Sequence, residues 1–139
     1  MHSIRLAAAV LLLAGASIAQ AAPATYITMD HSSEMLMNAA TANSLWKDNL
    51  PAALKRLYPV GRWGFASEVS GGFDDAKVCV ITARVLLLPR SGKNLVYRPE
   101  KSATAYGSQA SASPDQCRAL AKAKLGEAMA SMRAALSAR

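Results

Sequence analysis

Two cysteines, Cys79 and Cys117, are the only ones in the chain, and they constrain its fold more than any other feature. Cys79 lies near the start of an apolar segment typical of a β-strand, and Cys117 lies near the start of a helical pattern. In an oxidising compartment two cysteines allow one intramolecular pairing, and the C-x-x-C spacing of a redox site is absent from the sequence. We therefore predict a Cys79–Cys117 disulfide that ties a sheet to the last helix. Closing that loop should contribute about 4 kcal/mol to the free energy of unfolding.

The N-terminus has the three parts of a secretory signal peptide. Arg5 supplies the positive charge, residues 6–16 form a short apolar core, and Ala19-Gln20-Ala21 matches an A-x-A cleavage site. The apolar run is shorter than a transmembrane helix requires, and no later segment reaches the necessary length. We expect residues 1–21 to be removed and residues 22–139 to form a single periplasmic or secreted domain without a transmembrane segment. The alternative is an uncleaved N-terminal anchor.

The charge of the chain favours acidic partners. Sixteen basic and nine acidic residues give a net charge of +7, and removal of Arg5 with the signal peptide lowers it to +6. A positive field of this kind attracts an acidic protein face or an anionic polymer of the cell envelope. Export separates the protein from most nucleic acid, so we expect no nucleic-acid partner. The simpler interpretation is a soluble surface that happens to be basic.

Three stretches have the spacing of helices. Ser32 or Ser33 is a suitable N-cap for a first helix that ends before residue 51. Proline at the first turn then predicts a short second helix over residues 51–57. Ser113-Pro114-Asp115-Gln116 combines a capping box with proline at the first helical position, so the last helix begins there. Cys117 lies on the apolar stripe of that helix.

Three strands are predicted between the second and the last helix. Residues 62–70 alternate in polarity, and residues 78–88 have one wholly apolar face that includes Cys79. A three-residue turn, Arg90-Ser91-Gly92, leads into a third strand that ends at residue 106. Gly107 to Ala112 is a linker of small residues.

The strand registers follow from keeping apolar residues on one face. A slip of one residue would move every side chain to the opposite face, so the apolar pairing should prevail. The second and third predicted strands then pair Leu87 with Leu95, Val85 with Tyr97 and Cys79 with Ala103. The first and second predicted strands pair Val69 with Cys79 and Phe65 with Ala83.

These elements predict an α+β fold with the order α-α-β-β-β-α. We expect an antiparallel three-stranded β-meander with helices packed on one face, and with Cys79 on the covered side. Residues 23–31 are extended. Their pattern fits a short strand and an ordered arm equally well.

Three arginines form the candidate binding site. The predicted registers set Arg84 opposite both Gly64 and Arg98, with Arg62 on a diagonal, all on the sheet face away from the helices. Facing like charges destabilise a sheet unless something negative joins them. A charge ladder with Glu68 and Glu100 is one interpretation. The other is an anion- or partner-binding site in which Gly64 leaves room for a carboxylate or phosphate.

The same open face carries apolar residues. Val80, Leu86 and Val96 are expected to be exposed beside the arginines. An apolar patch rimmed by arginine would suit a protein partner, or self-association, better than a small ligand.

Catalytic and metal-binding sites have weak support. His31 is the only histidine after cleavage, and its neighbours Asp30, Ser32 and Ser33 are adjacent in sequence, which does not give the geometry of a catalytic triad. One histidine and two bonded cysteines leave no ligand set for zinc. Asp74-Asp75 lacks the ligand spacing of a calcium loop. We therefore expect no catalytic residues, no metal and no cofactor.

The sequence thus predicts a small exported, non-enzymatic binding or accessory protein. Its partner would be an acidic protein or an anionic envelope polymer, bound through a basic sheet face. The alternative is an envelope hydrolase or transferase with a cleft near His31.

Overall fold

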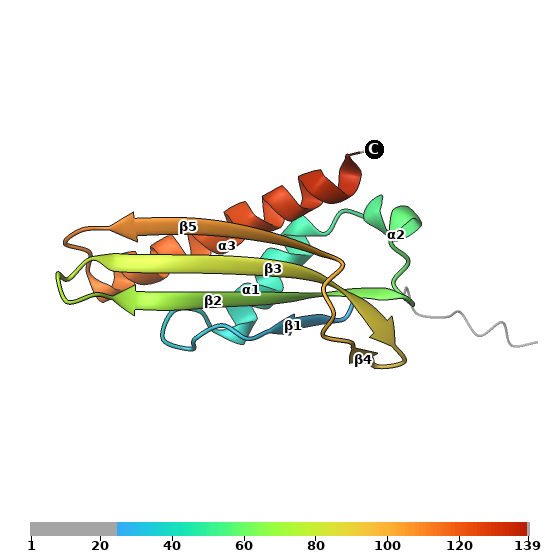
Figure 1. Cartoon of the computed structure of the whole chain (residues 1–139), viewed down its shortest axis with the longest axis horizontal. Helices are drawn as coiled ribbons and strands as arrows, with labels where there is room; N and C mark the ends of the chain where they lie inside the picture. Colours follow the sequence, from blue (N-terminus) through green and yellow to red (C-terminus); the bar gives the residue numbers. More distant parts are fainter. Residues whose placement is uncertain (1–24, 139) are drawn as a thin grey trace, which may run out of the picture.

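A computed structural model describes residues 25–138 (Figure 1). The predicted signal peptide and its cleavage site lie outside these residues. The chain forms a mixed α+β fold in which helices cover one face of a curled open sheet. The helices are α1 (Ala39–Asn49), α2 (Leu54–Leu57) and α3 (Pro114–Ser137), and the strands are β1 (Thr28–Asp30), β2 (Trp63–Phe73), β3 (Cys79–Ser91), β4 (Asn94–Leu95) and β5 (Lys101–Gln109).

The sheet is mixed and five-stranded, so the predicted three-stranded meander is wrong. β3 pairs antiparallel with β2 on one side and with β5 on the other. β1 adds to the free edge of β2 in parallel, and β4 forms a short hairpin with the end of β3. The short strand left open for residues 23–31 is present as β1, and the third predicted strand is divided into β4 and β5. Strands of two or three residues are too short to show an alternating pattern.

Both long registers differ from the predicted ones, yet the residues of β2, β3 and β5 keep their predicted faces. Leu95 of β4, in contrast, packs on the open face instead of the covered one. Val69 pairs with Ala83 instead of Cys79, and Cys79 pairs with Gln109 instead of Ala103. Each register shifts by an even number of residues, and an even shift does not exchange the two faces of a strand. The face of β3 that carries Cys79 and Ile81 is therefore buried under the helices, as predicted.

The hairpin after β3 departs further from the prediction. Ser91 pairs with Asn94, so the loop consists of Gly92 and Lys93. Gly92 has a φ of 60°, a conformation that glycine adopts at little cost. Leu95 pairs with Arg90, and Leu87, its predicted partner, pairs with Lys101. The chain leaves the sheet at residues 96–100 and returns as β5 (Figure 1).

The hairpin covers part of the open face of the sheet. Leu95 packs against Ala66, Leu86 and Leu88, which are all buried. The prediction that Leu86 is exposed is therefore wrong, while Val80 and Val96 are exposed as predicted. The apolar patch expected on this face is correspondingly smaller.

The Cys79–Cys117 disulfide is confirmed. It joins β3 to the first turns of α3 with a Cα–Cα distance of 5.7 Å, and both cysteines are buried. Around it, the main core fills the space between the sheet and the helices. Its large members include Trp46 of α1, Phe65 of β2 and Met129 of α3.

The helix starts were partly predicted. Ser113 and Gln116 form the expected capping box of α3. The first helix begins later than predicted, because Asn38 rather than Ser32 or Ser33 accepts the capping hydrogen bond, from the backbone of Thr41.

Candidate functional site: a basic end with a pocket

The three predicted site arginines do not face one another. Arg84 lies in the middle of β3, opposite Glu68 on β2 and Thr104 on β5. Arg62 directly precedes β2, where its carbonyl accepts a hydrogen bond from the backbone of Arg90. The distance from Arg84 to Arg90 along an extended strand is about 20 Å. Arg62 and Arg84 are therefore too far apart to share one small anion.

Arg98 lies nearer to Arg62 than to the middle of the sheet. It belongs to the segment that crosses from β4 to β5, which is held at both ends by hydrogen bonds to the end of β3, from Val96 to Pro89 and from Glu100 to Leu87. The predicted pairing of Arg84 with Arg98 is thus wrong. The binding role of the arginines stays a prediction.

Neither interpretation of the arginine cluster has the geometry expected for it. Arg84 lies opposite Glu68, but within residues 25–138 no carboxylate is in ion-pairing distance of Arg62, Arg84 or Arg98. The space expected beside Gly64 is filled, because a Cβ atom there would lie 2.5 Å from Cδ2 of Leu95. An anion cannot sit at Gly64 while the hairpin is in place.

Charge is instead segregated along the long axis of the molecule. At one end lie the C-terminal end of α1, α2, the loop before β2, the β3–β4 hairpin, the start of β5 and the C-terminal end of α3 (Figure 1). This end, which we call the basic end, carries nine basic residues and two acidic ones: Lys47, Lys55, Arg56, Arg62, Arg90, Lys93, Arg98, Lys101 and Arg133, with Asp48 and Glu100. The other described residues carry five basic and seven acidic side chains. All the excess positive charge of the described residues is therefore at one end, because the remainder is slightly acidic.

Arg90 holds the basic end together. Its Nε donates to the carbonyl of Gly92 at 2.6 Å, and one guanidinium nitrogen donates to the carbonyl of Val60 at 2.8 Å. These bonds join the hairpin to the loop that precedes β2. The sequence pattern marked Arg90 only as a turn residue, because its partners are backbone carbonyls that no spacing reveals.

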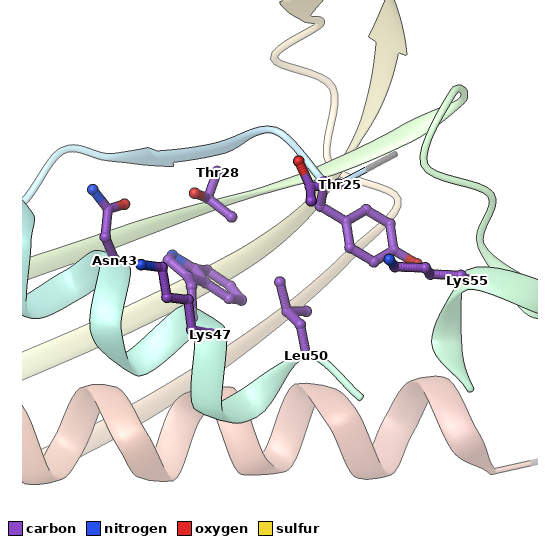
Figure 2. A pocket seen from close by; sticks show the side chains of 8 residues that line it. Thr25, Thr28, Asn43, Lys47, Leu50 and Lys55 are labelled. Atoms are coloured by element: carbon purple, nitrogen blue, oxygen red, sulfur yellow. The ribbon is translucent and has the colours of Figure 1, made fainter. Parts of the chain in front are cut away.

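A pocket of about 530 Å³ opens at the basic end between β1, α1 and α2 (Figure 2). This volume is within the range usual for small-molecule sites. Its lining residues are Thr25, Tyr26, Thr28, Asn43, Trp46, Lys47, Leu50 and Lys55. The sequence analysis missed the pocket because one of its walls is formed by β1 and the segment before it, which were not assigned to a strand.

Two aromatic side chains of the pocket are held in place. The hydroxyl of Tyr26 donates to the carbonyl of Tyr58 at 2.5 Å, and its ring meets Phe65 edge to face at a centroid distance of 5.0 Å. Partial burial raises the pKa of Tyr26, because the neutral hydroxyl tolerates burial better than the phenolate does. The indole of Trp46 packs on the same Phe65 at 5.2 Å.

A partly buried polar network supports β1 beside the pocket. Asp30 accepts hydrogen bonds from the hydroxyls of Ser67, at 2.7 Å, and Ser32, at 2.8 Å, on the same carboxylate oxygen. Ser67 in turn accepts from the indole nitrogen of Trp46 at 3.2 Å. The network fixes β1 against β2 and positions the base of the pocket.

His31 lies outside the pocket. Its side chain is exposed, and its nearest aromatic neighbour is Tyr97, at a centroid distance of 6.3 Å. The adjacent carboxylate of Asp30 already accepts bonds from Ser32 and Ser67. Neither His31 nor any carboxylate is among the described residues that line the 530 Å³ pocket.

Among residues 25–138, no three histidine, cysteine or acidic side chains are grouped so that they could hold a metal ion. None of the helices in this range combines the length and the apolar character needed to cross a membrane.

Comparison with known proteins gives likenesses in fold only. No protein family matches the chain, and no curated protein matches it. A PelC variant dodecamer from Paraburkholderia phytofirmans is 15% identical, with 78% of this chain and 89% of that chain covered and a TM-score of 0.44. A second PelC dodecamer structure from that organism is 14% identical, with 84% of this chain and 93% of that chain covered and a TM-score of 0.40. A candidate lipoprotein from Caulobacter crescentus is 10% identical, with 77% of this chain and 86% of that chain covered and a TM-score of 0.33. Such scores support no functional argument.

Proposed function

We propose that the protein is a small exported, non-enzymatic binding protein that holds an anionic polymer of the cell envelope against its basic end. The observation that carries the proposal is the segregation of charge, with nine basic residues and two acidic ones at the end formed by α2 and the β3–β4 hairpin. A surface of one sign concentrates counter-charged partners and speeds their association. The disulfide fits this setting, since such bonds persist in oxidising compartments outside the cytoplasm.

A polymer fits the basic end better than an acidic protein does. The centre of a protein interface is usually apolar and depleted in charge. Of the three apolar residues predicted to supply such a centre, Leu86 is buried beneath Leu95, which leaves only Val80 and Val96 exposed. The cations instead lie on several separate elements, from α2 to the start of β5. That distribution suits an extended chain with many negative groups.

The proposal can be tested with two charge-reversal variants of equal net charge. The first, Arg56→Glu with Lys93→Glu, alters the basic end, and the second, Arg118→Glu with Lys122→Glu, alters exposed positions on the opposite half of α3. The ion pair that the control variant loses, Arg118–Asp115, is exposed and is worth little. The measurement is binding of the mature protein to polygalacturonate at several salt concentrations.

We expect the basic-end variant to bind about tenfold more weakly, because the local field is lost, and the control variant to bind nearly as the wild type does. Equal weakening of both variants would mean that only total charge matters. That result would contradict the proposed site. Wild-type protein that does not bind the polymer would contradict the function.

A further inference from the structure

The pocket at the basic end has a charge of one sign. Lys47 of α1 and Lys55 of α2 line it, and no acidic side chain is among its lining residues. Figure 2 shows these lysines toward opposite ends of the opening, with Leu50 between them. A bound molecule would therefore meet a positive charge and an apolar side chain together.

The walls of the pocket differ in polarity. Asn43 and Lys47 are four residues apart on α1, so their side chains share one face of the helix. Thr28 of β1 lies across from them, and its hydroxyl and the Asn43 amide extend the hydrogen-bonding side (Figure 2). Leu50 and the ring of Tyr26 form the apolar side. The pocket thus offers hydrogen bonds, one apolar surface and positive charge within a single small volume.

The apolar side of the pocket is held in place by contacts within the protein. Tyr26 is fixed by its hydrogen bond to Tyr58 and by its edge contact with Phe65. Trp46 is fixed by its hydrogen bond to Ser67. Groups held in place beforehand lose little conformational freedom on binding, so their contacts contribute more to affinity.

We propose that this pocket binds one carboxylated sugar unit of the anionic polymer, an inference that rests on the proposed function. A pyranose ring carries hydroxyls around its rim and C–H groups on its faces, so it matches a pocket with one polar and one apolar side. The carboxylate would accept a charge-assisted hydrogen bond from Lys47. Asn43 and Thr28 would bond the ring hydroxyls, and Tyr26 and Leu50 would contact its C–H face.

The test uses an oligosaccharide short enough to report on the pocket alone. The probe is tetragalacturonic acid, and its fully methyl-esterified form is the neutral control with the same rings. Binding to the mature chain is followed by isothermal titration and by backbone amide chemical shifts. The variants are Lys47→Ala and Asn43→Ala in the pocket and Lys122→Ala, which removes an exposed lysine outside both the pocket and the basic end. Thermal unfolding shows that each variant is folded.

We expect the acid form to shift the amides of β1 and α1, and each pocket variant to bind about tenfold more weakly, since each removes a hydrogen bond to the ligand. Lys122→Ala should bind nearly as the wild type does, and the ester should bind much more weakly than the acid. Equal losses for Lys47→Ala and Lys122→Ala, or amide shifts confined to other elements, would overturn the inference.

A second arm separates a sugar site from a general anion site. Inorganic phosphate at the same ionic strength as a sodium chloride control should displace little tetragalacturonic acid. Displacement by phosphate at concentrations near those of the sugar would overturn the sugar assignment. If polygalacturonate still depended on Arg56 and Lys93 while the oligosaccharide did not enter the pocket, the inference would fail and the proposed function would stand.

Discussion

The indole nitrogen of Trp46 donates a hydrogen bond to the buried hydroxyl of Ser67 at 3.2 Å, which ties α1 to β2. Ser67 is 1% exposed and also donates to Asp30. One hydroxyl therefore joins α1, β1 and β2, the elements that frame the base of the pocket. A buried donor or acceptor that loses its partner keeps its desolvation cost without compensation.

The first prediction concerns this hydroxyl. Ser67→Ala leaves the Trp46 indole without its acceptor and removes one donor to Asp30, so the free energy of unfolding should fall by about 1–3 kcal/mol. Urea denaturation at neutral pH measures the change. Ser70→Ala, at an exposed position on the same strand, is the matched control and should change stability by about 0.5 kcal/mol or less. Equal effects of the two substitutions would show that the network does not stabilise the fold.

The second prediction concerns the disulfide between β3 and α3. Cys79→Ala with Cys117→Ala should lower the free energy of unfolding by about 4 kcal/mol, because the loop between residues 38 positions apart is no longer closed in the unfolded chain. The same loss should follow addition of a reductant to the wild-type protein. The double variant itself should not respond to reductant. A wild-type unfolding curve that is the same with and without reductant would rule out a stabilising bond.

The sequence predicted face assignments better than it predicted topology. Alternation along β2 and β3 determines which side chains face the helices, and that pattern survives any even shift in register. Phe65 and Val85 are therefore buried as expected, although neither has its predicted partner. The exact register depends on where the chain leaves the sheet, and the excursion of residues 96–100 has no local pattern that reveals it.

The candidate site was harder to predict from the sequence than the faces of the strands were. Net charge indicated a basic surface, but its location depends on which chain ends and loops meet in space. Lys47 and Lys55 belong to separate helices, and only the arrangement of α1 and α2 around residues 25–28 brings them to one pocket. Arg84 was instead predicted to have a neighbour that it lacks. The predicted register placed it opposite Arg98, and the observed register places it opposite Thr104.

The third prediction concerns the close approach of the hairpin to β2. A Cβ atom at Gly64 would lie 2.5 Å from Cδ2 of Leu95 and 2.7 Å from the backbone oxygen of Ile27. Gly64→Ala should therefore displace the hairpin or β1 and cost about 1–3 kcal/mol of stability. Gly126→Ala in α3, where a Cβ atom meets nothing within 4 Å, should instead raise stability by about 0.5–1 kcal/mol. Thermal or urea unfolding compares the two, and a neutral Gly64→Ala would show that Leu95 does not pack on β2 as described.

The fourth prediction concerns the alkaline limit of stability. The pKa of Tyr26 is raised in the folded protein by burial, so folding favours the neutral hydroxyl over the phenolate. This contribution is fully present below the ordinary tyrosine pKa of about 10 and is lost as pH rises through the higher pKa of the folded state. Tyr26→Phe cannot ionise, and it also lacks the hydrogen bond to Tyr58. The variant should therefore be less stable than the wild type at pH 8, and its stability should fall less steeply above pH 10.

Urea denaturation at pH 8, 10 and 11 measures both effects, with Tyr106→Phe as the control at an exposed tyrosine of β5. Parallel pH dependence of wild type and Tyr26→Phe would show that Tyr26 ionises equally in the folded and unfolded chains, and the aromatic side of the pocket would then be more open to water than its contacts indicate.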